Sequence, residues 1–216
     1  MNGFKKWLEN YWYHYKWMTI IITASIIALS ICLVQCSTKA DYDMYALYAG
    51  PTYIGGEQSS QLRDAINDYM GIDRQNVSIN SFVYVSESKM EEYKQGDAYV
   101  NQGINMQQTS DFFDFLYAAS FNMIIIDPEL YSLIKKNEIL TPMNDISDIA
   151  NSKSSDGYCI RLYDTSLPQK YSIFMSMPED TLLCFRKQVL MQNLSNKNNK
   201  ESYEYQKNIF KNIIEQ

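Results

Sequence analysis

The longest uninterrupted apolar run of the chain extends from Met18 to Val34 and contains no charged residue. As an α-helix with a rise of about 1.5 Å per residue, this run nearly crosses a hydrocarbon core of about 30 Å. The preceding segment is crowded with aromatic residues that suit the headgroup level of a membrane: Phe4, Trp7, Tyr11, Trp12, Tyr13, Tyr15 and Trp17. We therefore expect a juxtamembrane segment over residues 1–17, a transmembrane helix over 18–35, a linker over 36–42 and a separate domain over 43–216.

Charged residues on the two sides of this run predict its orientation. Three lysines and one glutamate precede it, whereas one lysine and two aspartates follow it closely. Because an excess of Lys and Arg marks the cytoplasmic side, we expect a single-pass membrane protein with its N-terminus in the cytoplasm and its C-terminal domain outside the cell. A cleaved signal peptide stays open as an alternative, since Thr38-Lys39-Ala40 is a passable cleavage site.

The domain that follows alternates strand-like and helix-like patterns. Its clearest unit is the wholly apolar run Met123–Ile126, followed by Asp127 as a helix N-cap and Pro128 at the first helical position. Further strands are expected at 43–49, 77–85, 158–163, 171–175 and 181–185, and helices at 59–70, 112–119 and 128–136. This order predicts an α/β fold with a mixed sheet, in which strands 43–49 and 123–126 are buried neighbours and the later strands form short antiparallel edges.

Composition removes several classes of function. The whole chain carries −6, and because residues 1–17 contribute +2, the rest carries −8, which disfavours binding to nucleic acid. The single histidine, His14, lies in the aromatic segment, so the C-terminal domain has no histidine base for a nucleophile and little to offer zinc. No phosphate-binding glycine loop ending in Lys-Ser or Lys-Thr is present. We therefore expect neither an enzyme nor a resident metal or cofactor.

Two cysteines of the C-terminal domain, Cys159 and Cys184, each lie in a short strand-like run. Two buried thiols and a disulfide are both compatible with that pattern, because sequence does not fix the distance between the α-carbons. Both alternatives stay open.

One stretch of the domain resembles a known family. Asn122–Tyr131 and Lys136–Met143 are similar to extracellular solute-binding proteins of the type 2 periplasmic-binding fold, and Tyr13–Trp17 with Asp43–Pro51 resembles membrane-anchored proteins of low-GC Gram-positive bacteria that carry such a domain. The resemblance implies a single reduced lobe of that fold, since complete solute-binding proteins have two lobes and are longer.

Two functions follow as expectations. The first is a membrane-tethered binding or sensing domain for a small solute, with the ligand beyond the carboxyl ends of the parallel strands. The candidate ligand-binding residues are Gly50, Pro51, Tyr53, Gly55, Gly56 and Asp127. The alternative is a scaffold or interaction subunit of a membrane complex that binds a membrane protein and no solute, for which the abundance of tyrosine, 18 in the chain, is suited.

Overall fold

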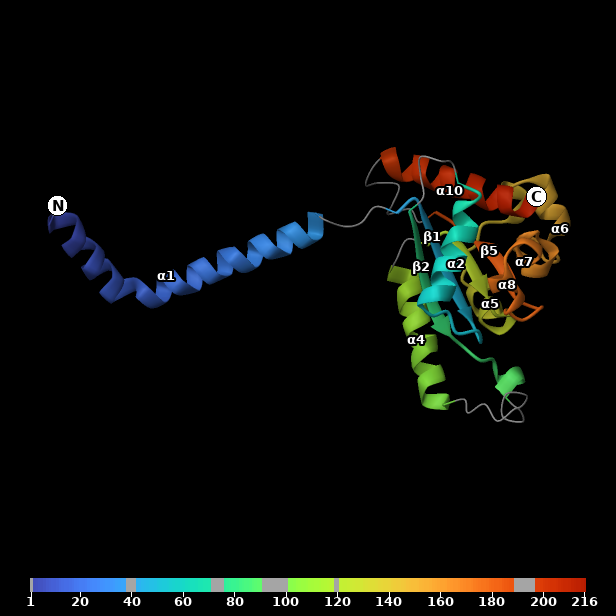
Figure 1. Cartoon of the computed structure of the whole chain (residues 1–216), viewed down its shortest axis with the longest axis horizontal. Coiled ribbons are helices and arrows are strands. Elements are labelled where there is room, and N and C mark those ends of the chain that lie inside the picture. The colour runs from blue at the N-terminus through green and yellow to red at the C-terminus, as the bar shows by residue number, and fades with distance from the viewer. Residues whose placement is uncertain (1, 38–41, 71–75, 91–100, 119–120, 189–196) are drawn as a thin grey trace. The chain divides into compact units, whose positions relative to one another are not determined.

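The computed structural model describes residues 2–37, 42–70, 76–90, 101–118, 121–188 and 197–216. It consists of two compact units, residues 1–41 and 42–216 (Figure 1).

The first unit is one helix, α1 (Asn2–Ser37), which continues through the aromatic segment and the apolar run. Its part over Gly3–Cys32 is long and apolar enough to cross a membrane, a criterion that a signal sequence also meets. Two hydroxyls in the apolar run are satisfied within the helix, because Thr19 donates to the Tyr15 carbonyl and Ser30 to the Ile26 carbonyl. A hydroxyl bonded in this way adds no unpaired polar group to an apolar surface.

Four aromatic rings form a ladder along one face of α1. Phe4, Trp7, Tyr11 and Tyr15 follow one another at helical spacing, and their successive ring centroids are 6.0, 5.8 and 5.4 Å apart. The rings are exposed, as a belt at the membrane interface requires.

The second unit is built on one five-stranded sheet. Its strands are β1 (Met44–Gly50), β2 (Val77–Val83), β3 (Met123–Ile126), β4 (Cys159–Arg161) and β5 (Leu182–Phe185), and their spatial order is β2-β1-β3-β5-β4. β1 pairs in parallel with both β2 and β3, whereas β5 is antiparallel to β3 and to β4. The expected mixed sheet and the pairing of the strands at 43–49 and 123–126 are therefore confirmed.

Helices cover both faces of this sheet, which makes a three-layer arrangement (Figure 1). One face packs against α4 (Gln102–Ala118) and α5 (Pro128–Lys135). The other face packs against α2 (Gly56–Asn67), α6 (Asp148–Lys153), α7 (Leu167–Lys170), α8 (Ser172–Met175) and α10 (Lys197–Glu215). Two short 3-10 turns, η1 (Met143–Asp145) and η2 (Leu162–Asp164), and helical residues at 87–90 are also described.

The strand expected at 171–175 is wrong, because α8 occupies Ser172–Met175. Ile173 and Phe174 are both buried in the same core cluster. A helical turn directs two successive side chains into one core, whereas a strand would send them to opposite faces of the sheet. The strand expected at 158–163 shortens to the three residues of β4, because η2 begins at Leu162.

Asp156 ties α5 to the start of β4 and gives the domain an acid-sensitive contact. Its carboxylate accepts hydrogen bonds from the Tyr131 hydroxyl, from Lys135 Nζ at 2.8 Å and from the Tyr158 backbone N–H at 3.0 Å. Burial acts to raise the pKa of Asp156, but the bonds from Lys135, Tyr131 and Tyr158 outweigh burial and hold that pKa well below its usual value.

Because the folded pKa is depressed, the stabilisation by Asp156 is complete above about pH 4 and is lost as the pH falls further toward the folded pKa. We expect the free energy of unfolding of the wild type to fall more steeply between about pH 4 and pH 2.5 than that of Asp156→Asn. Urea titrations at several pH values measure both slopes. Asp114→Asn, at an exposed position of α4, is the matched control and keeps the wild-type slope. Equal slopes for Asp156→Asn and the wild type would contradict the assignment.

Candidate functional site

The carboxyl ends of the three parallel strands meet at one edge of the sheet. From β1 the chain passes through α2, on one face of the sheet, to β2 on one side of β1. From β3, on the other side of β1, it continues into α5 on the opposite face. The direction in which strands are added therefore reverses between β1 and β3. Backbone hydrogen bonds continue from β1 to the residues that directly follow its two neighbouring strands. Asp127 N–H donates to the Ala49 carbonyl at 2.8 Å, and Tyr84 N–H donates to the Gly50 carbonyl at 2.9 Å. A point of reversed strand order is where open α/β sheets bind their ligands.

Gly50, the last residue of β1, lies against the side chain of Tyr48. A Cβ at this position would lie 2.6 Å from the Tyr48 hydroxyl oxygen. That oxygen accepts a hydrogen bond from Thr52 N–H at 2.9 Å, and the Tyr48 side chain is buried. Glycine therefore lets the buried tyrosine fold back over the strand end and fix the loop that follows.

Asp127 performs two roles at this edge. One carboxylate oxygen accepts from Glu129 N–H at 2.9 Å and caps α5, which confirms the N-cap prediction. The other oxygen accepts from Lys89 Nζ at 3.0 Å, and the side chain is only 1% exposed. The sequence pattern explained the cap and gave no sign of the lysine.

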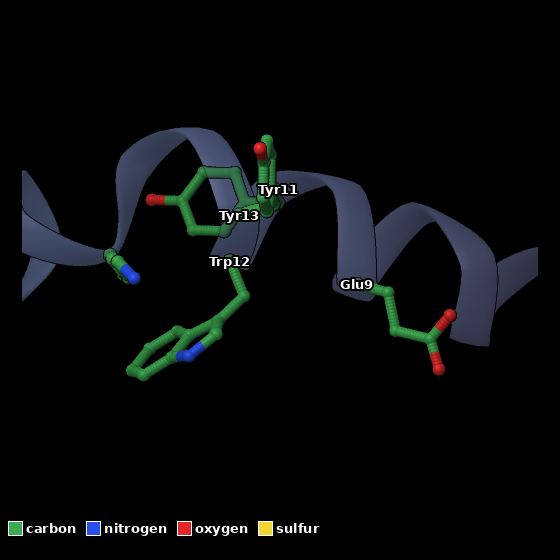
Figure 2. Close-up of a pocket in the computed structure, with 5 residues that line it drawn as sticks. Glu9, Tyr11, Trp12 and Tyr13 are labelled. Carbon is green, nitrogen blue, oxygen red and sulfur yellow. The ribbon is translucent and has the colours of Figure 1, made fainter.

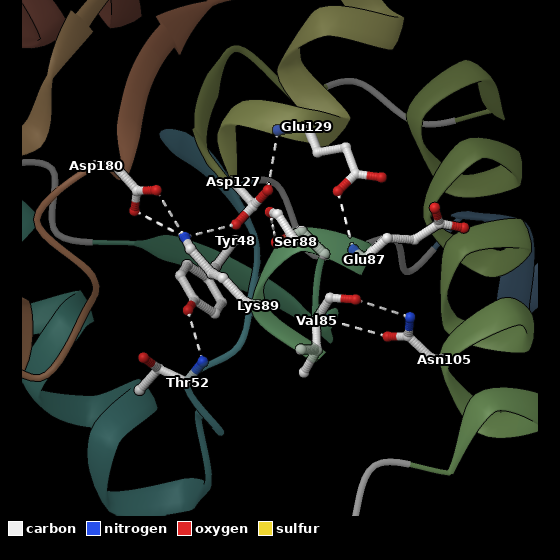
Figure 3. A network of polar contacts seen from close by, with 11 residues as sticks. Tyr48, Thr52, Val85, Glu87, Ser88, Lys89, Asn105, Asp127, Glu129 and Asp180 are labelled. Atoms are coloured by element: carbon white, nitrogen blue, oxygen red, sulfur yellow. Dashed lines mark hydrogen bonds and ion pairs between the residues drawn. The ribbon is translucent and has the colours of Figure 1, made fainter. Parts of the chain in front are cut away.

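Lys89 is shared between two carboxylates (Figure 3). Besides Asp127, its ammonium contacts Asp180, which precedes β5, at 2.7 Å. Burial acts to lower the pKa of Lys89, but the hydrogen bonds and charges of Asp180 and Asp127 outweigh it, so the pKa lies above its usual value. Protonated Lys89, in the chain that follows β2, thus connects Asp127, directly after β3, to Asp180, just before β5.

A groove of about 750 Å³ adjoins this cluster on the side of α4. It lies between the chain that leaves β2, the first turn of α5 and one face of α4. Its lining residues are Tyr84, Glu87, Met90, Gln102, Asn105, Met106, Thr109, Ser110, Phe113 and Glu129. Among the residues that the structure describes, the lining includes two glutamates and neither lysine nor arginine.

Hydrogen bonds hold the walls of the groove in place. Asn105 of α4 accepts from Val85 N–H and donates to the Val85 carbonyl, both at 2.9 Å. Glu129 Oε2 accepts from Glu87 N–H at 3.0 Å (Figure 3). Burial raises the pKa of Tyr84, and the charge and hydrogen bond of Glu129 raise it further. The Tyr84 hydroxyl is therefore a neutral hydrogen-bonding group at neutral pH.

The structure brings together only part of the candidate site expected from sequence. Gly50 and Asp127 meet at the carboxyl edge, with Pro51 directly after Gly50. Gly55 is the N-cap of α2 and Gly56 its first residue, whereas the Tyr53 side chain is 72% exposed. None of the six residues belongs to the lining of the groove, which depends on Glu87 and Glu129 instead.

Sequence reasoning missed the partners of Asp127 and the groove. Lys89 and Asp180 are 91 positions apart, and neither lies in a recognisable motif. The strand ends gave the only usable signal, because they predict the edge at which loops converge. Among the described residues, no cluster of three His, Cys, Asp or Glu side chains is placed to hold a metal ion.

A second hollow, of about 670 Å³, lies along α1 and is lined by Glu9, Tyr11, Trp12, Tyr13 and Lys16 (Figure 2). All five side chains come from about two turns of one helix, and no second element of the described chain lines the space. Exposed aromatic side chains along a single helix are sufficient to form such a hollow.

The sequence matches no family model, and comparisons with curated proteins and with solved structures give no match. The resemblance to solute-binding proteins therefore stands on local sequence pattern.

Proposed function

We propose that this protein is a membrane-tethered binding or sensing domain that takes a small organic cation in the groove between α4 and the carboxyl edge of the parallel strands, without catalysis. The observation that carries this proposal is a groove whose described lining contains two carboxylates and no cationic side chain, at the edge where open α/β sheets bind ligands.

Charge determines the class of ligand. Glu87 and Glu129 place negative charge at one end of the groove, and the neighbouring cation, Lys89, is already neutralised by Asp127 and Asp180. An anion entering the groove would meet repulsion, whereas an ammonium group would form charge-assisted hydrogen bonds with the glutamates.

The other walls of the groove would accommodate a ligand whose ammonium group is attached to an apolar or aromatic moiety. Met106 and Phe113 of α4 face the groove together with Met90. Methionine adapts to irregular ligand shapes, and an aromatic ring attracts a cation over its face. Mixed lining of this kind, apolar with a few convergent polar groups, is typical of small-molecule sites.

The same groups argue against catalysis. Lys89 is held protonated by two carboxylates, so it lacks the free amine that a nucleophile needs. Thr109 and Ser110 line the groove, but the single histidine of the sequence, His14, precedes this domain, so the domain has no histidine to activate a hydroxyl.

Three probes of similar shape test the charge selectivity: phenethylamine, phenethyl alcohol and phenylacetate. We expect the full-length protein in nanodiscs of zwitterionic lipid to bind the amine with a Kd on the order of 1 mM, and to bind the neutral and anionic probes at least tenfold more weakly. Glu87→Gln/Glu129→Gln should lower the affinity for the amine by about tenfold, while the control Glu201→Gln on α10 leaves it unchanged. Equal binding of all three probes, preference for phenylacetate, or binding of none would contradict the proposal.

The membrane topology is tested separately. We expect a membrane-impermeant lysine reagent to modify lysines of residues 42–216 in intact cells, because the charge asymmetry about the apolar run directs that domain outward. We also expect the mature chain to retain its first residues. Protection of the domain in intact cells would contradict the orientation, and a mature chain that begins at Asp41 would contradict the retained anchor.

An exposed stripe on α4 favours one alternative, an interaction subunit of a membrane complex. Met106 is 74% exposed and Tyr117 is 54% exposed, and Phe113 stacks on Tyr117 with ring centroids 6.4 Å apart. Aromatic residues and methionine on a surface are typical of protein interfaces. Two results together would favour this alternative: the wild-type protein purifies with a partner that Met106→Glu no longer retains, and phenethylamine does not bind.

A further inference from the structure

Cys159 and Cys184 are directly opposite each other on the antiparallel strands β4 and β5. Directly opposite residues of an antiparallel pair project to the same face of the sheet, and both cysteines belong to the core cluster beneath α4 and α5. Each is a free thiol in the structure. Because β4 and β5 are adjacent strands, the two cysteine side chains are direct neighbours.

The hydrogen-bond pattern defines which kind of pair this is. Leu162 N–H donates to the Thr181 carbonyl at 2.9 Å, which makes 162 and 181 a hydrogen-bonded pair just beyond the strands. Pair types alternate along an antiparallel ladder, so the pair Cys159 and Cys184, three steps further on, is of the non-hydrogen-bonded type. On the opposite side of β5, Arg186 N–H donates to the Asn122 carbonyl at 2.7 Å. Two steps along that ladder, Ile124 and Cys184 are therefore also a hydrogen-bonded pair. The backbone groups of Cys184 thus face β3, which agrees with a non-hydrogen-bonded pair toward β4.

Non-hydrogen-bonded pairs bring their α-carbons to about 4.5 Å, within the range of about 4.4–6.8 Å that disulfides span. We propose that Cys159 and Cys184 are a modification site at which an intrachain disulfide joins β4 to β5. The proposal is independent of ligand binding in the groove.

The oxidant is a small-molecule disulfide, such as oxidised glutathione. The thiolate of Cys159, after losing its proton, attacks one sulfur of the oxidant and releases one thiolate, leaving a mixed disulfide. The thiolate of Cys184 then attacks Cys159 Sγ and releases the second thiolate. The two protons lost by the cysteines go to the two released thiolates, so the pair is oxidised by two electrons and the oxidant is reduced by two.

Burial determines when this reaction takes place. The two cysteines are 2% and 0% exposed, and burial raises the pKa of Cys159 to about 11 and that of Cys184 well above its usual value. Thiolate is therefore scarce in the folded domain. We expect closure during folding, or whenever the three-residue edge strand β4 opens locally.

The disulfide would secure a weakly held edge. β4 has only three register pairs with β5, and the chain between the two cysteines includes Asp180, the partner of Lys89. A covalent link at the base of this segment restricts the unfolded chain and keeps Asp180 near the carboxyl edge.

The test uses the full-length Cys32→Ser/Cys36→Ser variant, in which Cys159 and Cys184 are the remaining cysteines of the four in the chain. The protein, in detergent micelles, is refolded from denaturant with oxidised glutathione, quenched in acid, alkylated under denaturing conditions and digested without reductant. We expect a peptide pair that joins the two cysteines, no alkylation before reduction, and a Tm that falls by roughly 10 °C on reduction.

The further variant Cys159→Ala is the matched control, and its Tm should not respond to reductant. Recovery of two alkylated thiols, of a stable glutathione adduct on either cysteine, or of disulfide-linked dimers would overturn the proposal. A disulfide whose reduction leaves the Tm unchanged would overturn its role in securing the edge.

Discussion

We expect Ile125→Asp to unfold the domain that follows residue 41. Ile125 is fully buried in β3, where its register partners are Tyr48 of β1 and Leu183 of β5. A carboxylate there would be desolvated without a partner, at a cost of at least several kcal/mol. Because domains of this size are stable by only about 5–15 kcal/mol, a change of that size removes most or all of the stability.

Circular dichroism and the soluble yield measure this outcome. Leu133→Asp is the matched control, because Leu133 lies on the neighbouring helix α5 and is 42% exposed. We expect the control to change the free energy of unfolding by no more than about 1 kcal/mol. A soluble Ile125→Asp protein with wild-type melting would contradict the position of β3 at the centre of the sheet.

The second large effect is expected at Asp127. Asp127→Ala removes the cap of α5, worth about 1 kcal/mol, and leaves Lys89 with a single, half-exposed carboxylate partner. Loss of one member of a buried ion pair costs about 3–5 kcal/mol, and because the Lys89 side chain is still 19% exposed we expect a total near the lower end of that range.

Asp127→Asn separates the two roles. From the cap alone this change would be nearly silent, since asparagine caps as well as aspartate. The ion pair with Lys89 changes that expectation to a loss of about 1–3 kcal/mol. Chemical denaturation measures both variants, and Asp180→Asn, at a half-exposed carboxylate, should cost less than about 1 kcal/mol.

A double-mutant cycle identifies the partner. Replacing Lys89 by methionine removes the charge that Asp127 neutralises, so Asp127→Asn should cost less in the Lys89→Met background than in the wild type. If the two costs are equal, or if Asp127→Asn is as stable as the wild type, the ion pair contributes nothing to folding.

The parts of the fold that sequence predicted well are those determined by neighbouring residues. The unit of β3, Asp127 and α5 was predicted nearly to the residue, because a wholly apolar run, a capping side chain and a proline at the first helical position occur together. The long apolar run likewise predicted a helix over residues 18–35, although α1 extends well beyond that range at the amino end.

The failures have physical causes of two kinds. A short apolar run such as 171–175 is ambiguous between strand and helix until tertiary packing selects one, and the shared core selected the helix. The contacts of Lys89 and the groove beside it depend on residues far apart in sequence, so no local pattern contains them. α4 carries apolar residues on both its buried and its exposed sides, which hid the face that lines the groove.

The position of the proposed ligand site is tested most directly by NMR of methyl-labelled methionines during titration of the full-length protein with phenethylamine. Met90 and Met106 line the groove, whereas Met175 is comparably exposed to Met106 but lies on α8, outside that lining, and Met44 and Met123 are in the core. We expect saturable shifts of the Met106 and Met90 methyl signals, reduced in Glu87→Gln/Glu129→Gln, while the Met175 signal does not move. Shifts at Met175 without shifts at Met106, or no saturable shift at any methionine, would contradict the proposed ligand site.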